Sequence, residues 1–372
     1  MKVGILSLNI YEKDNNWGSV LQSWALQKSL KEMGVDAYVI NYKPSIMTHN
    51  TARYPVLYSI KRGKLNFLCH LLLDICQSVD YLKRDNKFRK FIDSNYITTP
   101  FYDENNIELL NMDGYVVGSD IVWNEQFWNG YDKAFFCDYG CMKQKMNIAY
   151  APSMGANFSP TLEQELPRLL SNFKALSLRE ASQVKYLQNF TNIPVENVID
   201  PTLLLNAQEY EKFILPNLDT PYILVYCVAQ NNELIRMATE YAKRNKLKTI
   251  VIKCCPTGKN HHIKGLENKN DVGIEEWLTY IKNANYVFTT SYHACIFSIL
   301  FKKQFCAVYD DFGKSKIVNL LSMFHINNHA DNVADAFNRI DEINYNEIDA
   351  ILEYERKKSL NFLRINIEAL GV

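Results

Sequence analysis

The sequence predicts an α/β protein of two domains, each with a parallel sheet covered by helices on both faces, and three observations predict this class. Almost continuously apolar runs, such as residues 222–228 and 248–253, alternate with stretches of helical periodicity, as expected of strands buried on both faces. The chain has 372 residues, 47% of them hydrophobic, which suffices for two cores. A less regular stretch at residues 205–221 separates two series of these alternations.

The first series begins with a strand at residues 2–8 and a helix at 18–33, which Gly34 terminates. Further helical stretches are expected at residues 65–77, 80–92, 161–172 and 180–188. The other strands are expected at residues 37–42, 114–117, 146–150, 175–178 and 197–199. We place this domain at residues 1–204.

The second series has strands at residues 222–228, 248–253, 286–289 and 305–309, and we place its domain at residues 205–344. The remaining residues, 345–372, are predicted to form a C-terminal helix that packs back across the domains. Ligands of parallel sheets bind beyond the carboxyl ends of the strands, so residues there are the first candidates for a site.

The charges are balanced, with 41 Lys and Arg against 41 Asp and Glu. No global field therefore favours nucleic acid, and we expect no nucleic-acid partner. The start, MKVGILSLNI, has too short an apolar run for a secretory signal, and nine cysteines occur at irregular spacings. These features favour a reducing compartment and a cytoplasmic location.

The most apolar window, residues 65–76, is too short to span a bilayer. Its basic flanks would suit an interfacial helix at the inner face of a membrane, although a buried helix or a subunit contact explains the window more simply. The flanking residues are Lys61, Arg62, Lys64, Lys83 and Arg84.

Two loops that follow strands could contact a ligand. The loop from Asp14 to Ser19 opens a helix and offers backbone N–H groups to an anion, although it lacks a GxGxxG or GKS/T fingerprint and an ordinary capped turn explains it as well. The segment Gly118-Ser119-Asp120 leads to Trp123-Asn124, where a sugar could stack on Trp123 unless this ring fills the core.

Arg179 directly follows a predicted strand, and its planar fork could bind a carboxylate or phosphate unless it forms an ion pair with Glu180. His293 joins another strand to an apolar helix, a position from which an imidazole could transfer a proton. A structural role for this histidine is the alternative. Adjacent pairs such as Cys254-Cys255 and His261-His262 do not suit a metal site, and we expect no metal or cofactor.

An ordered set of segments resembles the polysaccharide pyruvyl transferase family from about residue 2 to residue 325. These segments are NNWGSVLQSWALQKSLKEMG, VINYKP, DGYVVGSDIVWN, IAYAPSMG, LSLREASQVKYL, VIDPTLLL and EEWLTYIKNANYVFTTSYHACIFSILF. The resemblance implies a glycosyltransferase-B-like fold, with two Rossmann-like domains that face each other across a cleft. It also implies phosphoenolpyruvate as donor substrate and a sugar acceptor, within a lipid-linked oligosaccharide or a surface polysaccharide such as a capsule, with a pyruvate ketal as product. Peripheral membrane contact and a homo-oligomer are compatible with this interpretation.

By resemblance, Arg179 matches the donor-binding arginine and His293 the histidine at the strand-to-helix junction. Other members carry Arg-Leu-His where this chain has Ser291-Tyr292-His293. An arginine is therefore missing, and Lys316 or Lys253 could replace its charge. Asp120 matches the motif that follows a strand of the first sheet. The residues expected to bind the substrates are Asn16, Gly18, Ser19, Gln22, Ser119, Trp123, Asn124, Ser291, Tyr292 and Lys316.

These residues lead to a hypothesis in which Arg179 and the start of the first helix bind the donor, His293 acts as general acid and base, and Asp120 completes the catalytic group. Two alternatives stay open. One is a glycosyltransferase that uses a nucleotide sugar, and the other is a non-catalytic subunit of a polysaccharide assembly.

Overall fold

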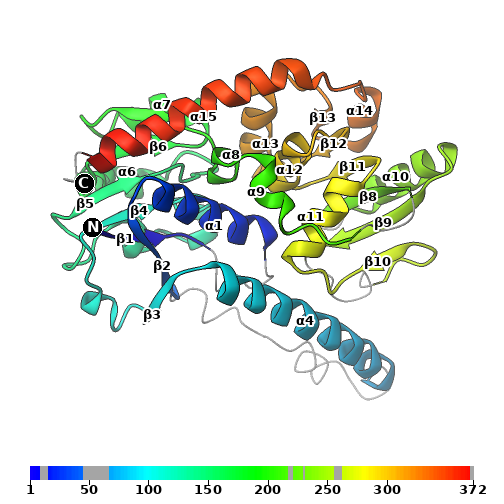
Figure 1. Ribbon diagram of the computed structural model, residues 1–372, viewed down its shortest axis with the longest axis horizontal. Helices are drawn as coiled ribbons and strands as arrows, with labels where there is room; N and C mark the ends of the chain where they lie inside the picture. The colour runs from blue at the N-terminus through cyan, green and yellow to red at the C-terminus, as the bar shows by residue number, and fades with distance from the viewer. Residues whose placement is uncertain (9–15, 45–66, 217–220, 229–230, 255–261, 369–372) are drawn as a thin grey trace.

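The computed structural model describes residues 1–8, 16–44, 67–216, 221–228, 231–254 and 262–368. Its strands form two sheets in which every pairing is parallel. Figure 1 shows the two sheets side by side, with the first domain at the left and the second at the right.

The first sheet has seven strands in the order β3-β2-β1-β4-β5-β6-β7. Their bounds are Lys2–Leu6 (β1), Asp36–Tyr42 (β2), Thr98–Tyr102 (β3), Gly114–Val117 (β4), Met146–Ala149 (β5), Ala175–Leu178 (β6) and Val195–Asn197 (β7). The order reverses between β1 and β4, which makes this a doubly wound sheet.

The second sheet has six strands in the order β10-β9-β8-β11-β12-β13. Their bounds are Tyr222–Cys227 (β8), Lys248–Lys253 (β9), Glu267–Lys269 (β10), Tyr286–Thr289 (β11), Phe305–Val308 (β12) and His329–Ala330 (β13). In chain order this sheet reads 3-2-1-4-5-6, the Rossmann arrangement. The predicted class of two Rossmann-like α/β domains is therefore confirmed. The boundary between residues 204 and 205 stays a prediction.

The helices connect the strands and cover the sheets. The longer ones are α1 (Trp17–Glu32), α4 (Phe67–Asn95), α6 (Pro160–Leu170), α7 (Ala181–Gln188), α10 (Asn232–Arg244), α11 (Ile274–Asn283), α12 (Tyr292–Leu300), α13 (Asp311–Met323) and α15 (Tyr345–Glu368). The shorter ones are α5 (Glu125–Trp128), α8 (Pro201–Leu204), α9 (Ala207–Glu211) and α14 (Val333–Asn338).

Several predicted elements need correction. The two helical stretches expected at residues 65–77 and 80–92 form one helix, α4. The strand expected at 197–199 lies at Val195–Asn197, because Asp200 caps α8 and ends the extended segment. The strands β3, β10 and β13 were not predicted, since they are short edge strands whose mixed composition lacks an apolar run.

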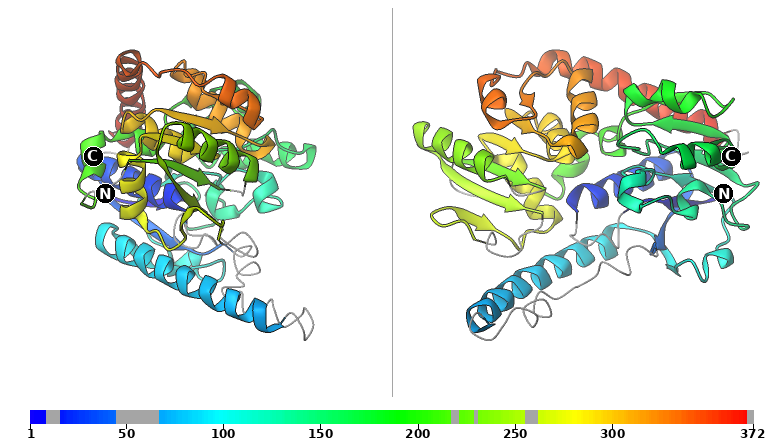
Figure 2. Two further views of the ribbon diagram at one scale, coloured as in Figure 1. Left: turned by 90° about the vertical axis from the view of Figure 1, so that its right-hand side faces the viewer. Right: turned by 180° about the vertical axis from the view of Figure 1, so that it is seen from behind.

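Two helices tie the domains together on opposite sides. Figures 1 and 2 show α15 along one side of both sheets and α4 along the other. Arg356 of α15 donates to the carbonyl of Leu203 at 2.8 Å, and Ser359 accepts from the amide of Ile199 at 3.0 Å. Lys302 of the second domain pairs with Asp349 of the same helix at 2.6 Å. The C-terminal helix therefore packs back across the domains, as predicted.

The two basic residues that follow the apolar window, Lys83 and Arg84, differ in exposure. Arg84 is 1% exposed, and its guanidinium donates from Nη1 to the carbonyl of Cys254 at 2.6 Å. It thus points into the protein, whereas Lys83 is exposed. Lys61, Arg62 and Lys64 lie outside the described residues. No helix in the described part of the chain combines the length and apolarity needed to cross a bilayer.

Candidate functional site

The site is built where the carboxyl ends of β6, β7 and β11 approach one another across the domain boundary. Arg179 follows β6, Asp200 follows β7, and His293 lies in the first turn of α12, which follows β11. Arg179 Nη1 donates to Asp200 Oδ2 at 2.9 Å. His293 Nε2 lies 3.6 Å from the same oxygen, which is an ion-pair distance and slightly long for a hydrogen bond. Asp200 therefore joins the two predicted residues.

The guanidinium of Arg179 is almost fully buried, with 3% of the side chain exposed. Its Nε donates to Glu180 Oε1 at 3.3 Å, and its centre lies 4.2 Å from the centroid of the Tyr292 ring. The ion pair with Glu180 that the sequence left as an alternative is thus present, but it is buried and forms part of a cluster. Cation–π contact and two carboxylates hold the arginine in one orientation.

Neighbouring groups in the cluster keep Asp200 and Arg179 ionised. Burial opposes ionisation of the Asp200 carboxyl, but His293, Arg179 and Thr202 together hold its pKa below the ordinary value. Burial likewise opposes the charge of Arg179, while Tyr292 and the surrounding carboxylates raise its pKa above the usual range. Both groups therefore stay charged at neutral pH.

His293 is seated against the start of α1 in the other domain. A Cβ placed on Gly18 would lie 2.0 Å from His293 Nδ1 and 2.1 Å from its Cγ. Only glycine allows this approach, so Gly18 has a steric reason that the sequence did not disclose. The imidazole therefore has Asp200 on its Nε2 side and the first turn of α1 on its Nδ1 side.

A second network links Asp120 to the same helix. Ser19 Oγ donates to Asp120 Oδ2, and the amide of Ile121 donates to its Oδ1 at 3.0 Å. Gln22 accepts from the amide of Ser119 at 3.1 Å and donates from Nε2 to Ser7 Oγ at 2.7 Å. These side chains are buried, so they hold α1 on the carboxyl edge of the first sheet.

The start of α1 is less open to an anion than the sequence suggested. Asn16 caps the helix, and its Oδ1 accepts from the amides of Gly18 at 3.0 Å and Ser19 at 3.4 Å. Two of the N–H groups expected to bind a donor are thus satisfied within the chain. Asp14 and Asn15 of the same predicted loop lie outside the described residues.

The predicted sugar platform belongs to the core. Trp123 is 1% exposed and stacks on Phe136 at a centroid distance of 5.1 Å. Its Nε1 donates to the carbonyl of Phe135 at 2.8 Å, so its ring has no open face for a sugar. Asn124, 3% exposed, caps α5 by accepting from the amide of Phe127 at 2.8 Å.

The residues around the missing arginine have structural roles. Ser291 caps α12 by accepting from the amide of Ala294 at 3.3 Å, and Tyr292 carries the ring that faces Arg179. Lys316 lines a small cavity with Arg179, Asp200 and Tyr292. The cavity of about 10 Å³ has room for no more than one water molecule. Lys253 is buried at the end of β9, and burial lowers its pKa.

Sequence reasoning missed Asp200 and gave Glu180 only the role of an ion-pair partner. Asp200 precedes Pro201 at a helix start, and its Oδ1 accepts from the amide of Thr202 at 3.0 Å. A capping role explained the residue locally and concealed its long-range role. Its position at the carboxyl end of β7 was the signal that could have identified it.

Three buried polar atoms in this cluster have no hydrogen-bond partner: Arg179 Nη2, Glu180 Oε2 and His293 Nε2. They comprise a cationic donor, an anionic acceptor and a ring nitrogen that can gain or lose a proton. Buried polar atoms are rarely left unpaired without a reason. The described residues contain no group of three or more His, Cys, Asp or Glu side chains placed to hold a metal ion.

Comparisons with known structures show only distant likeness. The chain is 12% identical to the UDP-GlcNAc 2-epimerase of Methanocaldococcus jannaschii in complex with UDP-GlcNAc and UDP, with 98% of this chain and 99% of that chain covered and a TM-score of 0.48. It is 11% identical to the E. coli heptosyltransferase WaaC, with 95% and 99% covered and a TM-score of 0.38.

No curated protein matches the chain. The family model described as polysaccharide pyruvyl transferase matches residues 16–311. This match includes every residue of the cluster described above. The chain belongs to the polysaccharide pyruvyl transferase family.

Proposed function

We propose that this transferase of polysaccharide biosynthesis moves a pyruvyl group from phosphoenolpyruvate to two hydroxyls of a sugar. The observation that carries the proposal is the set of three unpartnered atoms on Arg179, Glu180 and His293. Phosphoenolpyruvate would offer an anionic acceptor to Arg179, and a sugar hydroxyl would donate to Glu180. His293 would exchange a proton with the substrates.

The reaction needs one proton donor and one anion clamp. Protonation of the methylene carbon of phosphoenolpyruvate makes the neighbouring carbon electrophilic, and one sugar hydroxyl attacks it to form the first C–O bond. A second hydroxyl attacks the same carbon, the bond to the phosphate oxygen breaks, and inorganic phosphate leaves. One hydroxyl proton replaces the proton given to the methylene carbon, and the other leaves with phosphate.

In this scheme His293 supplies and recovers the proton. Asp200, 3.6 Å from Nε2, stabilises the imidazolium by its negative charge. The domains must move apart to admit the substrates, because these groups are buried. Arg179 Nη2 then binds the donor carboxylate or phosphate, while Glu180 Oε2 accepts a hydrogen bond from a sugar hydroxyl. Asp120 is a positioning residue, because it orients Ser19 at the helix start against which His293 is seated.

A polar pocket at the same edge of the first sheet suits the acceptor. It has a volume of about 470 Å³, within the range of small-molecule sites. It adjoins the cluster through Met154, because the preceding residue, Ser153, donates to Glu180 Oε1 at 2.7 Å. Its polar lining includes Gln126, Asn129 and Asn157, whose side-chain amides can pair with sugar hydroxyls. Glu125 and Ser159 also line it, but they bond to each other at 2.6 Å.

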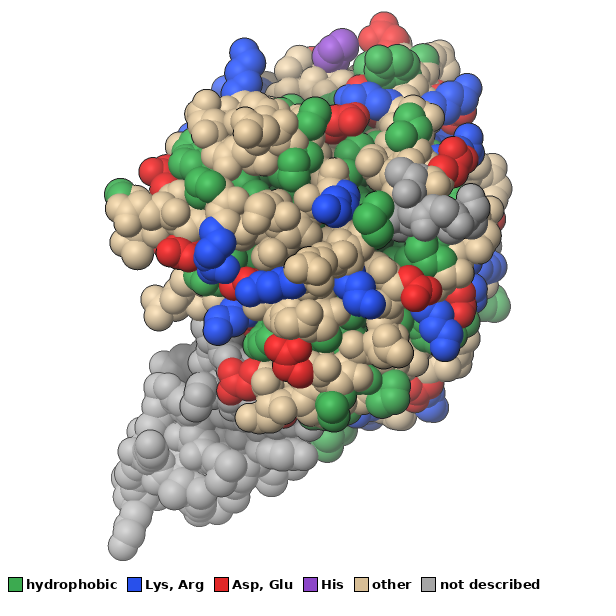
Figure 3. Space-filling view, turned by 90° about the vertical axis from the view of Figure 1, so that its left-hand side faces the viewer, with side chains coloured by type: hydrophobic (Ala, Val, Ile, Leu, Met, Phe, Trp, Pro, Cys, Tyr) green, Lys and Arg blue, Asp and Glu red, His purple; other side chains and the backbone are tan. Residues whose placement is uncertain are grey.

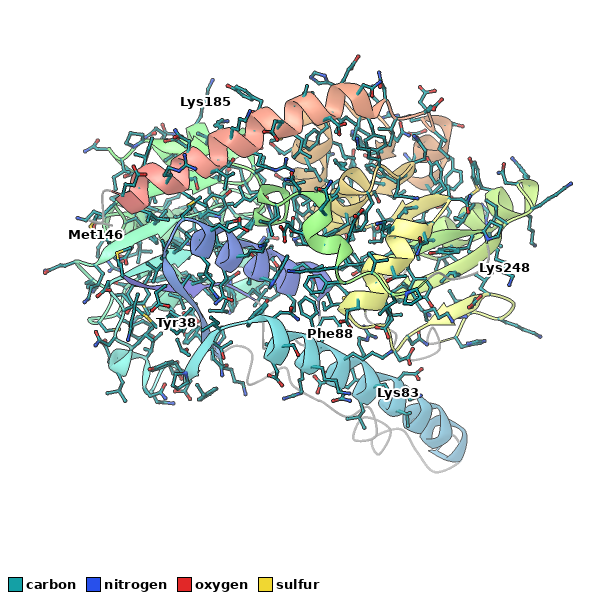
Figure 4. The ribbon with its side chains drawn as sticks, viewed as in Figure 1. Tyr38, Lys83, Phe88, Met146, Lys185 and Lys248 are labelled. Carbon is teal, nitrogen blue, oxygen red and sulfur yellow. The ribbon has the colours of Figure 1, made fainter. Side chains whose placement is uncertain are left out.

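The test combines binding with turnover. Phosphoenolpyruvate should raise the melting temperature of the protein, because a ligand that binds only the folded state stabilises it. His293→Ala should lower pyruvyl transfer by about 100-fold or more while the melting temperature without ligand stays close to that of the parent chain. Lys248→Ala, at the exposed start of β9 (Figure 4), is the control and should leave transfer unchanged.

Three results would contradict the proposal. Stabilisation by nucleotide sugars but not by phosphoenolpyruvate would indicate a glycosyltransferase. Stabilisation by neither would indicate a non-catalytic subunit. Unchanged pyruvyl transfer by a folded His293→Ala variant would remove the histidine from the chemistry.

A further inference from the structure

A second buried arginine lies between the domains, outside the cluster around Asp200. Arg84 belongs to α4, and its side chain passes over Trp17, with 5.2 Å between the guanidinium carbon and the ring centroid. Nη1 donates to the carbonyl of Cys254, just beyond the carboxyl end of β9. The arginine therefore bridges a helix of the first domain and the ligand-binding edge of the second sheet.

The remaining donors of Arg84 are unsatisfied. Nε and Nη2 are both buried and have no hydrogen-bond partner. The side chain forms no ion pair with any carboxylate of the described residues, and nearby acids are engaged elsewhere: Asp85 pairs with Arg89, and Asp271 and Glu276 pair with Lys87. A buried cation without a counter-ion is costly.

A third unpartnered donor borders the same tryptophan. Trp277 of α11 stacks on Trp17 with a centroid distance of 6.2 Å, and its Nε1 is buried without a partner. Trp17 itself is satisfied, because its Nε1 donates to the carbonyl of Gly273 at 2.9 Å. Phe88, labelled in Figure 4, packs against the indole in an edge contact with 5.5 Å between the ring centroids. The surroundings of Trp17 thus hold three orphaned donors in an otherwise apolar setting.

We propose that Arg84 binds an oxyanion of the donor substrate, a phosphate or carboxylate group, and so supplies the cation that Ser291 does not provide. Two free N–H groups of one guanidinium match two oxygens of such a group. Trp17, which the guanidinium of Arg84 faces, precedes Gly18, the residue against which His293 is seated. The donor atoms are closed off from water, so ligand entry requires the seam between the domains to part.

This inference names a residue for the proposed reaction and rests on that function, but its binding step can be tested by itself. The probe is inorganic phosphate, titrated at constant ionic strength while the melting temperature is recorded. Arg84→Met keeps most of the side-chain volume and removes the charge. Lys87→Met is the matched control, because Lys87 lies one turn further along α4 and also bridges to the second domain, through Asp271 at 2.9 Å and Glu276 at 2.7 Å.

We expect phosphate to stabilise the parent chain and Lys87→Met equally. The apparent affinity of Arg84→Met for phosphate should be at least about 10-fold lower. The apparent affinity for phosphoenolpyruvate should fall by a similar factor. If Arg84→Met does not fold, Arg84→Lys keeps the charge without the fork and should weaken phosphate binding while it preserves the fold.

Equal phosphate binding by Arg84→Met or, should that variant not fold, by Arg84→Lys would overturn the inference. If Arg84→Met loses phosphate binding but the parent chain does not turn over phosphoenolpyruvate, the anion site is supported and the proposed function is rejected. Normal turnover and donor affinity in Arg84→Met would reject the anion site and leave the proposed function intact.

Discussion

Arg179 and Arg84 are both buried at the boundary between the domains, but only one of them is neutralised by the protein. Arg179 has two carboxylates within 3.3 Å and the face of Tyr292. Arg84 has the face of Trp17 and a single carbonyl. The difference indicates that Arg179 helps to maintain the cluster even without substrate, whereas the charge of Arg84 is compensated only when a ligand supplies the anion.

The largest expected effect on stability tests this difference directly. Arg179→Met leaves Asp200 and Glu180 buried without their cation, which should lower the free energy of unfolding by about 3–5 kcal/mol. Arg84→Met removes an uncompensated charge and one hydrogen bond, the one to the carbonyl of Cys254, so the loss should be about 1–2 kcal/mol. Urea denaturation of both variants measures the two losses of unfolding free energy. Equal losses would show that the two arginines do not differ in this way.

A substitution without any change in charge should have an intermediate effect. The added methyl of Gly18→Ala would lie 2.0 Å from His293 Nδ1 and must displace the imidazole from Asp200. Overpacking of this kind costs about 1–3 kcal/mol, and pyruvyl transfer should fall with it. Gly313→Ala is the control for the same added methyl with a much milder contact, because its nearest neighbour, Asp310 Oδ1, would be 3.3 Å away and needs to shift only slightly. A Gly18→Ala variant with the melting temperature and activity of the parent would show that His293 is not held at this position.

The smallest effect should come from Asp132, which, unlike Asp200, forms no ion pair with a basic residue in the described part of the chain. Burial raises the pKa of Asp132 to about 6, although Tyr42 donates to its carboxylate at 3.0 Å. The unfolded chain loses this proton near its ordinary pKa of about 4, so the folded state loses stability as the pH rises from about 4 to 6. Asp200, whose pKa is lowered, acts in the opposite direction and loses stability as the pH falls below about 4.

Asp132→Asn keeps the oxygen that accepts from the amide of Ala134 at 2.8 Å and cannot ionise. It should exceed the parent chain in stability by about 1–2 kcal/mol above pH 6, with the advantage shrinking toward pH 4. Thermal denaturation of both chains across this pH range measures the stability difference as a function of pH. An advantage that does not depend on pH would show that the buried charge is not its cause.

Surface charge takes little part in these contrasts. Figure 3 shows acidic and basic side chains interspersed over one end of the molecule, in line with the zero net charge of the sequence. Interspersed charges produce no broad field at this end of the molecule, so the proposed function assigns donor binding to the few buried groups described above.

Sequence patterns identified the buried strands and two residues that follow strands, because these features depend on the local sequence. Strands such as β4, β6, β9 and β11 were predicted at their observed bounds, because a strand buried on both faces must be apolar along its length. Arg179 and His293 were selected because each follows a strand of a parallel sheet, the position where such sheets bind ligands.

Tertiary structure alone decided which side chains meet. Asp200 has a sufficient local role as a helix cap, and a basic residue such as Arg84 looks the same in sequence whether its helix faces lipid or protein. Trp123 could equally have been a platform or part of the core. Pairing and burial of charges depend on contacts between residues more than a hundred positions apart, as between Gly18 and His293, and no short pattern carries that information.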